Sequence, residues 1–195
     1  MIDRAAAFRN PENALEFRLL AATGCRRGEV CGLQWRDFDF DSEPVRVLIR
    51  RAMLEIEKKL IVQDTKTHAV RSVGLDEETS EMLRLHRARA AELGLASGIP
   101  PAPEDFVFRK TPGTSEPLPL DRIGQAWGRY CKELGVKARL HDLRHLQASM
   151  LLDAGEAVTV VAARLGHRGT STTLKVYSHL MPGADIEQRR SSGLP

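Results

Sequence analysis

The apolar residues of this chain recur at helical spacing in some segments and in short continuous runs in others. Leucines repeat at helical spacing between Asn10, which can cap a helix, and Gly24, which can end one, and they predict a helix over 11–23. A second helix is expected from about Arg26 to the region of Asp37. We interpret the following part as a three-stranded antiparallel meander, whose strands are segments rich in Val, Ile and Leu at 45–51, 60–63 and 70–75.

The second half of the chain is expected to be helical apart from one loop. Asp76 supplies a cap for a long helix, and a loop rich in Gly and Pro follows over 94–104. A short strand is expected at 106–108, ahead of a helix capped by Asp121. The pattern is that of one α+β domain, mostly helical, over residues 1–195. Further helices are predicted near 141–154, 157–165, 171–180 and 184–190.

Length and composition are those of an ordinary globular domain. The chain has 195 residues, of which 42% are hydrophobic and 28% charged, so disordered and fibrous classes are excluded. No apolar run approaches the roughly 18 residues that a membrane-spanning helix needs, and the start of the chain carries no secretory signal. Three widely spaced cysteines favour a reducing setting and have neither a disulfide framework nor metal-site spacing. We therefore expect a cytoplasmic protein without a membrane segment.

The net charge of +3 is unevenly distributed along the chain. Residues 1–120 hold 18 Lys and Arg against 19 Asp and Glu, whereas residues 121–195 hold 11 against 7. The basic excess is therefore C-terminal. An excess of this size is compatible with a nucleic-acid partner and equally with an ordinary solvated surface, so charge alone does not decide the function.

The C-terminal third holds most of the candidate chemistry, beginning with His141-Asp142-Leu143-Arg144-His145. On a helix, His141, Arg144 and His145 share one face, which is also the pattern of a polar surface stripe. The spacing of the two histidines is that of zinc ligands in metalloproteases. Against a zinc site, Asp142 replaces the usual glutamate and Arg144 brings a permanent positive charge. Further along stand Leu165-Gly166-His167 and, ten residues later, Tyr177.

Two earlier segments carry candidate anion-binding groups. In Thr23-Gly24-Cys25-Arg26-Arg27-Gly28-Glu29, an arginine follows a glycine break at the start of a helix, where backbone N–H groups and a guanidinium both suit phosphate oxygens. The alternative is that both arginines are solvated residues of a helix start. Lys66 lies in the connection between the second and third expected strands, where an exposed lysine ordinarily serves solubility alone.

In chain order, these segments resemble the sequence boxes of the tyrosine recombinases, the phage-integrase family, over about 15–186. The segment from Thr23 to Glu29 is similar to the family's first arginine box, Thr-Gly-x-Arg-x-x-Glu, and this match selects Arg26 over Arg27. Lys66 stands where the family places the lysine of a hairpin. The remaining matches are His141-Asp142-Leu143-Arg144 to the His-x-x-Arg box, and Leu165-Gly166-His167 with Tyr177-Ser178-His179 to the final box and its nucleophile.

The resemblance implies the fold of the family's catalytic domain, with a small three-stranded antiparallel sheet, and an enzyme that cleaves and rejoins double-stranded DNA. Tyr177 is then the nucleophile, which forms a 3′-phosphotyrosine. Arg26 and Arg144 can each offer a planar fork to the non-bridging phosphate oxygens, and His167 can add a hydrogen bond. The reaction needs neither a metal ion nor a nucleotide cofactor, and the chain carries no Walker loop.

The same resemblance assigns the proton transfers. His141 is the expected acceptor of the tyrosine proton, because histidine titrates near neutrality. The leaving group is a deoxyribose 5′-hydroxyl, whose alkoxide is too basic to depart without a proton, and Lys66 is the implied general acid. Glu29 is expected to orient the surrounding arginine and histidine side chains without contacting DNA.

Two other functions remain open from the sequence. A type IB topoisomerase shares this mechanism but relaxes supercoils as a monomer. A non-catalytic DNA-binding fragment or decayed integrase is suggested because only about 14 residues precede the first matched helix, so that the family's core-binding domain is absent from this chain. Leu146, which stands where many relatives carry a hydroxyl residue, is a further departure.

The expected partner is double-stranded DNA, and the expected location is the nucleoid. Residues 181–195 resemble the tail that relatives dock onto a neighbouring protomer by a heterologous contact. The resemblance therefore implies a homo-tetramer on DNA for a full-length protein and a monomer for the isolated domain.

Overall fold

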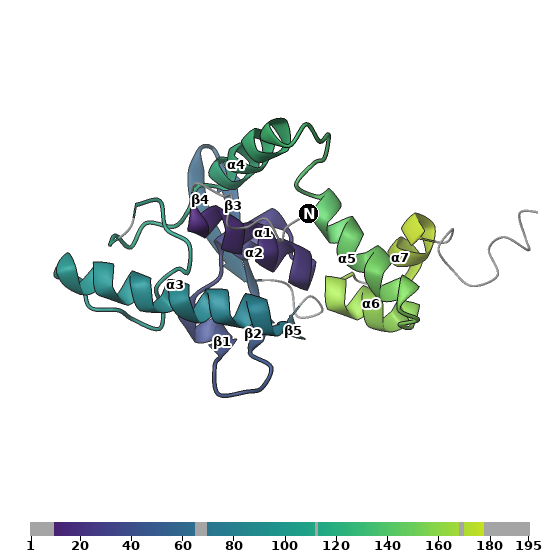
Figure 1. Ribbon diagram of the computed structural model, residues 1–195, viewed down its shortest axis with the longest axis horizontal. Helices are drawn as coiled ribbons and strands as arrows, with labels where there is room; N and C mark the ends of the chain where they lie inside the picture. The colour runs from purple at the N-terminus through teal and green to yellow at the C-terminus, as the bar shows by residue number, and fades with distance from the viewer. Residues whose placement is uncertain (1–9, 65–69, 112, 168–169, 178–195) are drawn as a thin grey trace, which may run out of the picture.

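The computed structural model describes residues 10–64, 70–111, 113–167 and 170–177, and it is organised in two parts (Figure 1). We call the first part, from α1 to α4 with all the strands, the body, and the second part, α5 to α7, the C-terminal unit. The helices are α1 (Pro11–Thr23), α2 (Arg27–Cys31), α3 (Glu77–Ala96), α4 (Leu120–Glu133), α5 (Asp142–Asp153), α6 (Val158–Leu165) and α7 (Thr170–Tyr177), with a 3₁₀ turn at Trp35–Asp37. The strands are β1 (Phe38–Asp39), β2 (Arg46–Ile49), β3 (Arg51–Ile56), β4 (Lys59–Asp64) and β5 (Arg71–Gly74).

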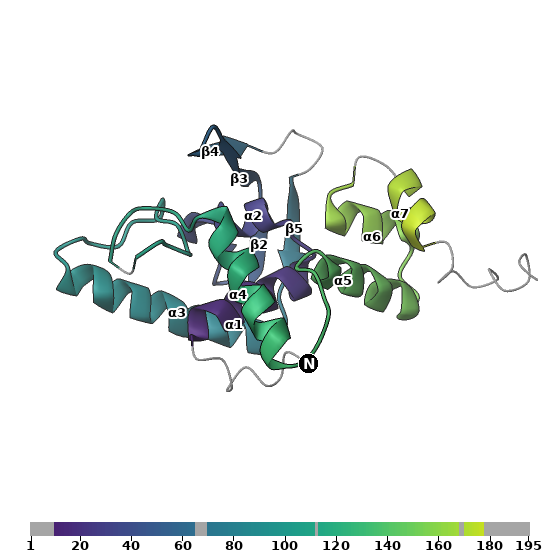
Figure 2. The ribbon, with the colours of Figure 1, turned by 90° about the horizontal axis from the view of Figure 1, so that it is seen from above.

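The strands form two antiparallel sheets, which corrects the predicted single meander. The three-stranded sheet has the order β1-β2-β5, so that Val47 of β2 pairs directly with Val73 of β5. The predicted middle strand at 60–63 instead pairs with β3 in a separate hairpin, which projects from the body in Figure 2. The chain can double back here because Glu57 and Lys58 both have positive φ angles. Such turns usually carry Asn or Gly. This turn carries neither, so the sequence pattern does not predict it.

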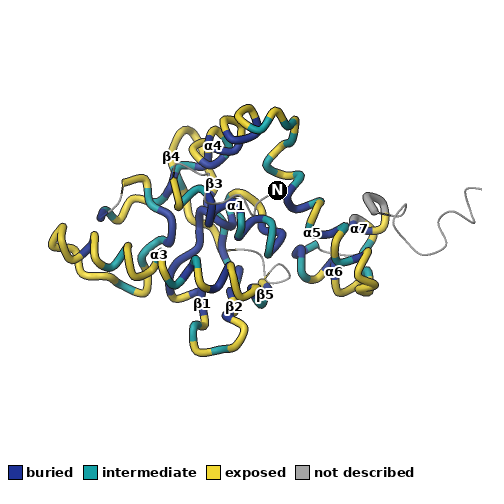
Figure 3. Tube along the Cα trace, viewed as in Figure 1, coloured by how far each residue is buried: buried dark blue, intermediate teal, exposed yellow. Residues whose placement is uncertain are grey.

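The core of the body is built around α1. The helix begins where the side chain of Asn10 accepts a hydrogen bond from the backbone of Glu12, and it ends at Gly24, which has a φ of +65°. Both ends were predicted from the sequence. Most of its side chains are buried (Figure 3), and the ring of Phe17 packs edge-on against Trp127 of α4 at a centroid distance of 5.0 Å. Burial of such apolar side chains, worth about 1.5–3 kcal/mol each, fixes α1 as the central element of the body.

Helix α2 is shorter than predicted, because the chain leaves the helix at Gly32 and enters the 3₁₀ turn. Its glycines allow a close approach to β3. A Cβ atom at Gly28 would lie 2.4 Å from the carbonyl oxygen of Met53, and one at Gly32 would lie 3.2 Å from the Met53 nitrogen. The helix start that carries Arg26 is therefore held against the sheet hairpin by backbone contact.

The C-terminal unit has its own small core, formed by Ala148, Leu152, Val161 and Leu165. It lies on one side of the body, on the right in Figures 1 and 2, where α5 packs against α1 and α6 contacts β5. The predicted helix at 184–190 lies outside the described residues. Within the described residues, no helix is both long and apolar enough to cross a membrane.

Two smaller expectations are corrected in the region before α5. The segment 106–108 is not a strand; it makes a single bridge from Phe106 to Gln34. Pro119, not Asp121, occupies the N-cap position of helix α4. Asp121 lies in the first turn, where its Oδ1 is 3.6 Å from Nη1 of Arg27. The overall class, α+β and mostly helical with a small antiparallel sheet, agrees with the prediction.

Candidate functional site

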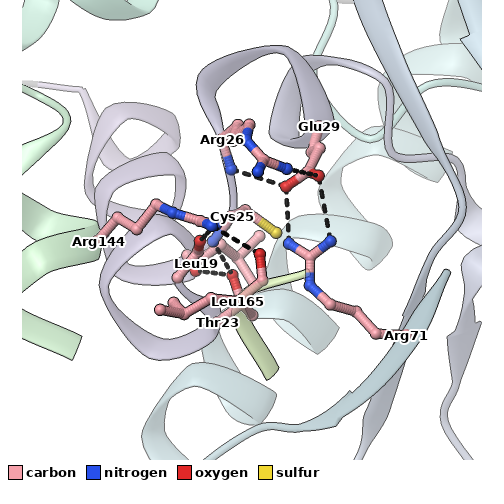
Figure 4. Close-up of polar contacts among 9 residues, drawn as sticks. Leu19, Thr23, Cys25, Arg26, Glu29, Arg71, Arg144 and Leu165 are labelled. Atoms are coloured by element: carbon pink, nitrogen blue, oxygen red, sulfur yellow. Dashed lines mark hydrogen bonds and ion pairs between the residues drawn. The ribbon is translucent and has the colours of Figure 1, made fainter. Parts of the chain in front are cut away.

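Glu29 is the centre of a buried charge cluster in the body (Figure 4). One carboxylate oxygen accepts a hydrogen bond from the backbone N–H of Arg26 at 2.8 Å, and the other accepts from its Nη1 at 3.1 Å. Arg71 of β5 approaches the same carboxylate with both Nη atoms, at 3.1 and 2.7 Å. The structure thus brings Glu29 to Arg26, the arginine selected by the sequence.

The electrostatics of this cluster favour its charged form. Burial alone raises the pKa of Glu29, but the hydrogen bonds and charges of Arg71 and Arg26 outweigh it, and the net pKa lies below the ordinary value. The side chain of Arg26 remains 48% exposed. Arg26 can therefore meet an anion from solution while Glu29 holds its backbone N–H and its Nη1.

Arg144 extends from α5 of the C-terminal unit toward the same cluster, and two carbonyl groups hold its guanidinium. It is 4% exposed, and it donates from Nη1 to the carbonyl oxygen of Gly24 and from Nη2 to that of Leu165 at 2.7 Å (Figure 4). Gly24 has a φ of +65°, and a Cβ atom there would lie 2.5 Å from the side chain of Leu165, so this position favours glycine. Burial and the charge of Arg26 lower the pKa of Arg144 to about 10, which leaves it cationic at neutral pH.

His167 follows α6 and contacts α7. Its Nδ1 lies 2.8 Å from Oγ1 of Thr173. Burial lowers the pKa of His167 to about 4, with further contributions from the charges of Arg144, Arg26 and Arg71. The ring is therefore neutral at pH 7, and it lies within the electric field of all three arginines. We call this group, formed by Arg26, Glu29, Arg71, Arg144 and His167, the basic corner.

His141 lies at the start of α5, and its ring meets that of His145 edge-on at a centroid distance of 4.8 Å. Burial, together with the neighbouring charges of His145 and Arg144, holds the pKa of His141 below its ordinary value. The expected shared face is only partly present, because Arg144 turns into the body while the two histidines contact each other. The sequence pattern predicts the helical spacing of the three residues, but it does not predict that Arg144 is buried in the body while the two histidines contact each other.

Two predicted residues cannot be placed in the site. Lys66 lies outside the described residues. Tyr177 is the last residue of α7, but its side chain also lies outside what the structure describes. Among the described side chains, no group of three or more His, Cys, Asp and Glu residues is arranged to hold a metal ion.

The sequence motifs did not point to two residues of this region: Arg71, which belongs to the basic corner, and Thr173, which contacts His167. Arg71 is buried at the start of β5, on the same face of the strand as Val73. A charged residue at an inward position of a strand is a recognisable signal, because successive side chains alternate between faces. Thr173 gave a weaker signal, since a threonine in a helix carries no specific chemistry by itself.

Residues 3–183 match the family model of the phage integrase family. A tyrosine recombinase XerC-like protein of Caldanaerobacter subterraneus subsp. tengcongensis is 30% identical over 178 residues, which cover 85% of this chain and 45% of that protein. The ICEBs1 integrase of Bacillus subtilis is 28% identical over 167 residues, which cover 85% of this chain and 44% of that protein. The chain thus spans less than half the length of these relatives.

Solved structures share the fold. The Tn1549 transposon integrase, in complex with a circular intermediate DNA, aligns with a TM-score of 0.75 and 20% identity over 97% of this chain and 62% of that one. XerA recombinase aligns with a TM-score of 0.67 and 22% identity over 100% of this chain and 60% of that one. Because the family match covers most of the chain, this protein belongs to the phage integrase family.

Proposed function

We propose that this chain is the catalytic domain of a site-specific tyrosine recombinase, which cleaves and rejoins double-stranded DNA through a covalent bond between Tyr177 and a 3′-phosphate. The observation that carries the proposal is the convergence of Arg26, Arg144 and His167, from three separate parts of the chain, in the basic corner. Arg144 donates to the carbonyl groups of Gly24, two residues before Arg26, and of Leu165, two residues before His167. Membership of a family whose curated members are named tyrosine recombinases and integrases supports it.

The basic corner suits a phosphodiester in the act of substitution. Attack at phosphorus shifts negative charge onto the non-bridging oxygens, and fixed cations stabilise that charge. Arg26 supplies an exposed guanidinium, and Arg144 supplies a buried charge whose partners are carbonyl groups. A neutral His167 can donate one hydrogen bond to the same phosphate.

The proton transfers follow from the groups around the phosphate. In the proposed step, the phenol oxygen of Tyr177 bonds to phosphorus as the bond to the 5′-oxygen breaks. A tyrosine has an ordinary pKa of about 10, so its proton must be removed during attack, and His141, neutral at pH 7, is the proposed acceptor. We assign the protonation of the leaving 5′-oxygen to Lys66. Glu29 orients Arg26 and does not contact DNA.

The proposed assembly follows from the chemistry of strand exchange. Recombination between two duplexes cleaves four strands, and four tyrosines are therefore required. We propose a homo-tetramer on DNA, to which each protomer contributes residues 1–195 as one catalytic domain. Arg144 and Arg164 support a single domain, because both donate hydrogen bonds across the boundary between the C-terminal unit and the body. Light scattering of the protein bound to DNA measures the assembly.

The covalent intermediate is the sharpest test of the function. We expect the wild-type chain, incubated with nicked duplexes of randomised sequence, to form an adduct that survives denaturing electrophoresis and is linked through a 3′-phosphate. Tyr177→Phe should form none. Tyr130→Phe is the matched control, because it removes the hydroxyl of the only other tyrosine, which is buried in the body, and should leave adduct formation intact.

The other outcomes separate the remaining hypotheses. Absence of an adduct in the wild type, with DNA retained on the protein, contradicts the proposal and favours a non-catalytic DNA-binding protein. Relaxation of supercoiled plasmid by the monomer, without selection of any sequence among the trapped duplexes, favours a topoisomerase.

A further inference from the structure

Thr173 is a fully buried polar side chain on α7, a short helix that contacts α6. Its exposure is 0%, and its hydroxyl lies 2.8 Å from Nδ1 of His167. On α7, the neighbouring Ser171 and Leu174 are both exposed. A buried hydroxyl that loses its hydrogen bond destabilises the fold, so this contact constrains both the ring and the helix.

The state of His167 determines which atom donates in this contact. The ring is neutral at pH 7, because burial and three nearby arginines disfavour its protonation. A neutral imidazole carries its hydrogen on one nitrogen and a lone pair on the other. If Nδ1 carried the hydrogen, Nε2 would present a lone pair, which repels an anion. If the hydroxyl of Thr173 donates to Nδ1, the hydrogen is on Nε2, which can then donate to a phosphate oxygen.

The same contact ties His167 to the helix that ends at Tyr177. Helix α7 has eight residues, and a helix of that length is marginally stable without tertiary contacts. Along α7, Thr173 lies four residues, about one helical turn, before Tyr177. A hydrogen bond at Thr173 therefore sets the rotation of α7 relative to His167.

We propose that Thr173 is a positioning residue, whose hydroxyl donates to Nδ1 of His167, fixes the hydrogen on Nε2, and seats the helix that carries Tyr177. Thr173 contacts neither DNA nor the reacting atoms. The kinetic part of this inference rests on the proposed function, whereas the position of the hydrogen on His167 does not.

The tautomer can be measured directly on the whole chain. We expect nitrogen NMR of protein labelled at histidine, with the His167 signals assigned by their loss in His167→Gln, to show Nε2 protonated and Nδ1 unprotonated at pH 7. Thr173→Val, which has the same shape but no hydroxyl, should give a mixture of tautomers. Thr173→Ser, which retains the hydroxyl, should restore the wild-type signals. A wild-type ring with its hydrogen on Nδ1 overturns the proposal, whatever the variants do.

The second readout is the rate of adduct formation on nicked DNA. We expect Thr173→Val to slow the adduct about 10- to 100-fold, by analogy with the loss of the hydrogen-bond partner of a metal-binding histidine. DNA affinity should change less than twofold, and Thr173→Ser should recover most of the rate. Ser171→Ala, which removes an exposed hydroxyl from the same helix, is the matched control and should be neutral.

The two measurements distinguish failure of the proposed function from failure of the positioning role. If the wild type forms no adduct, the proposed function is wrong while NMR still decides the tautomer. Equal rates for Thr173→Val and the wild type contradict a positioning role. If Thr173→Val does not fold, the wild-type spectrum and the rate of Thr173→Ser decide the question.

Discussion

Buried arginines of the body such as Arg71 and Arg51 are held by carboxylates, whereas Arg144 and Arg164 of the C-terminal unit are held by carbonyl groups. Arg71 and Arg26 both contact Glu29, and Arg51 contacts Asp37. Arg144 and Arg164 instead donate to the carbonyl oxygens of Gly24 and Ala22, where α1 ends. The last carbonyls of a helix lack intrahelical partners, so they accept such hydrogen bonds readily.

This difference in arginine partners predicts different roles for the arginines of the two parts. A carboxylate neutralises the arginine it binds, and it thereby reduces the attraction of that arginine for a phosphate. A carbonyl group fixes the geometry of a guanidinium but leaves its full charge available to a ligand. Arg144 is therefore expected to contribute most to charge stabilisation. Glu29 is expected to contribute most to the stability of the body.

The largest expected effect on stability is that of Glu29→Gln. This change removes the carboxylate that the buried Arg71 contacts, and breaking a buried ion pair in this way costs about 3–5 kcal/mol. The free energy of unfolding, measured with urea, should fall by that amount. Asp121→Asn is the matched control: its ion pair with Arg27 is exposed, so its loss should cost less than about 1 kcal/mol. Similar costs for both changes would contradict the comparison.

The next effect is that of Arg144→Lys on catalysis. Lysine keeps the charge but lacks the planar fork, and it cannot reach both carbonyl groups. The rate of adduct formation should fall about 10²- to 10³-fold, as for the loss of one preorganised donor. Arg164→Lys is the matched control, because Arg164 also binds the end of α1 but is not part of the basic corner. It should lower stability by about 1 kcal/mol and leave the rate nearly unchanged.

The fold was predictable where its determinants are local. The residues at the two ends of α1 gave its boundaries, because a cap and a glycine act on the adjacent turn. The strand pairing was mispredicted because two features gave no signal. The segment predicted as one strand divides at Arg50 into two strands, β2 and β3, that belong to different sheets. The tight turn at Glu57 and Lys58 contains no glycine.

The site was predictable as a set of residues but not as a set of contacts. Of the residues to which the motifs pointed, Glu29 contacts Arg26, and Arg144 binds the carbonyl group of Leu165, two residues before His167. Lys66 and the side chain of Tyr177 lie outside the described residues, so their place in the site stays a prediction. The partners that hold the described site residues come from distant segments: Arg71 lies 42 residues from Glu29, and Gly24 lies 120 residues from Arg144. Spacing along the chain carries no information about such pairs, which form only when separate elements pack.

The two parts should also differ in the pH range over which they lose stability. The folded-state pKa of His167, about 4, is below its unfolded value of about 6.5. The unfolded chain therefore binds more protons between these values, and stability falls as the pH drops from about 6.5 to about 4. Glu29, whose pKa is lowered from 4.5, holds its contribution above that value and loses it only at lower pH.

Urea unfolding as a function of pH separates the two contributions. His167→Gln should flatten the slope between pH 6.5 and 4 and leave the loss below pH 4.5 in place. A residual slope is expected from His141, whose pKa is also lowered, and an opposite one from Glu16, whose pKa burial raises to about 8. An unchanged slope in His167→Gln would show that this histidine is not held neutral by the fold.

The smallest expected effect is that of Leu146→Thr, which tests whether carbonyl groups alone hold Arg144. The family resemblance implies a hydroxyl residue at this position, yet here Leu146 is 49% exposed, and the partners of Arg144 are the carbonyls of Gly24 and Leu165. A surface change of this kind should alter the free energy of unfolding by less than about 0.5 kcal/mol, and the adduct rate should stay within twofold. Leu143→Thr, buried three residues earlier, is the control and should be clearly destabilising. A gain in rate of tenfold or more for Leu146→Thr would mean that a hydroxyl at 146 acts on the arginine, and that the two carbonyls leave it incompletely positioned.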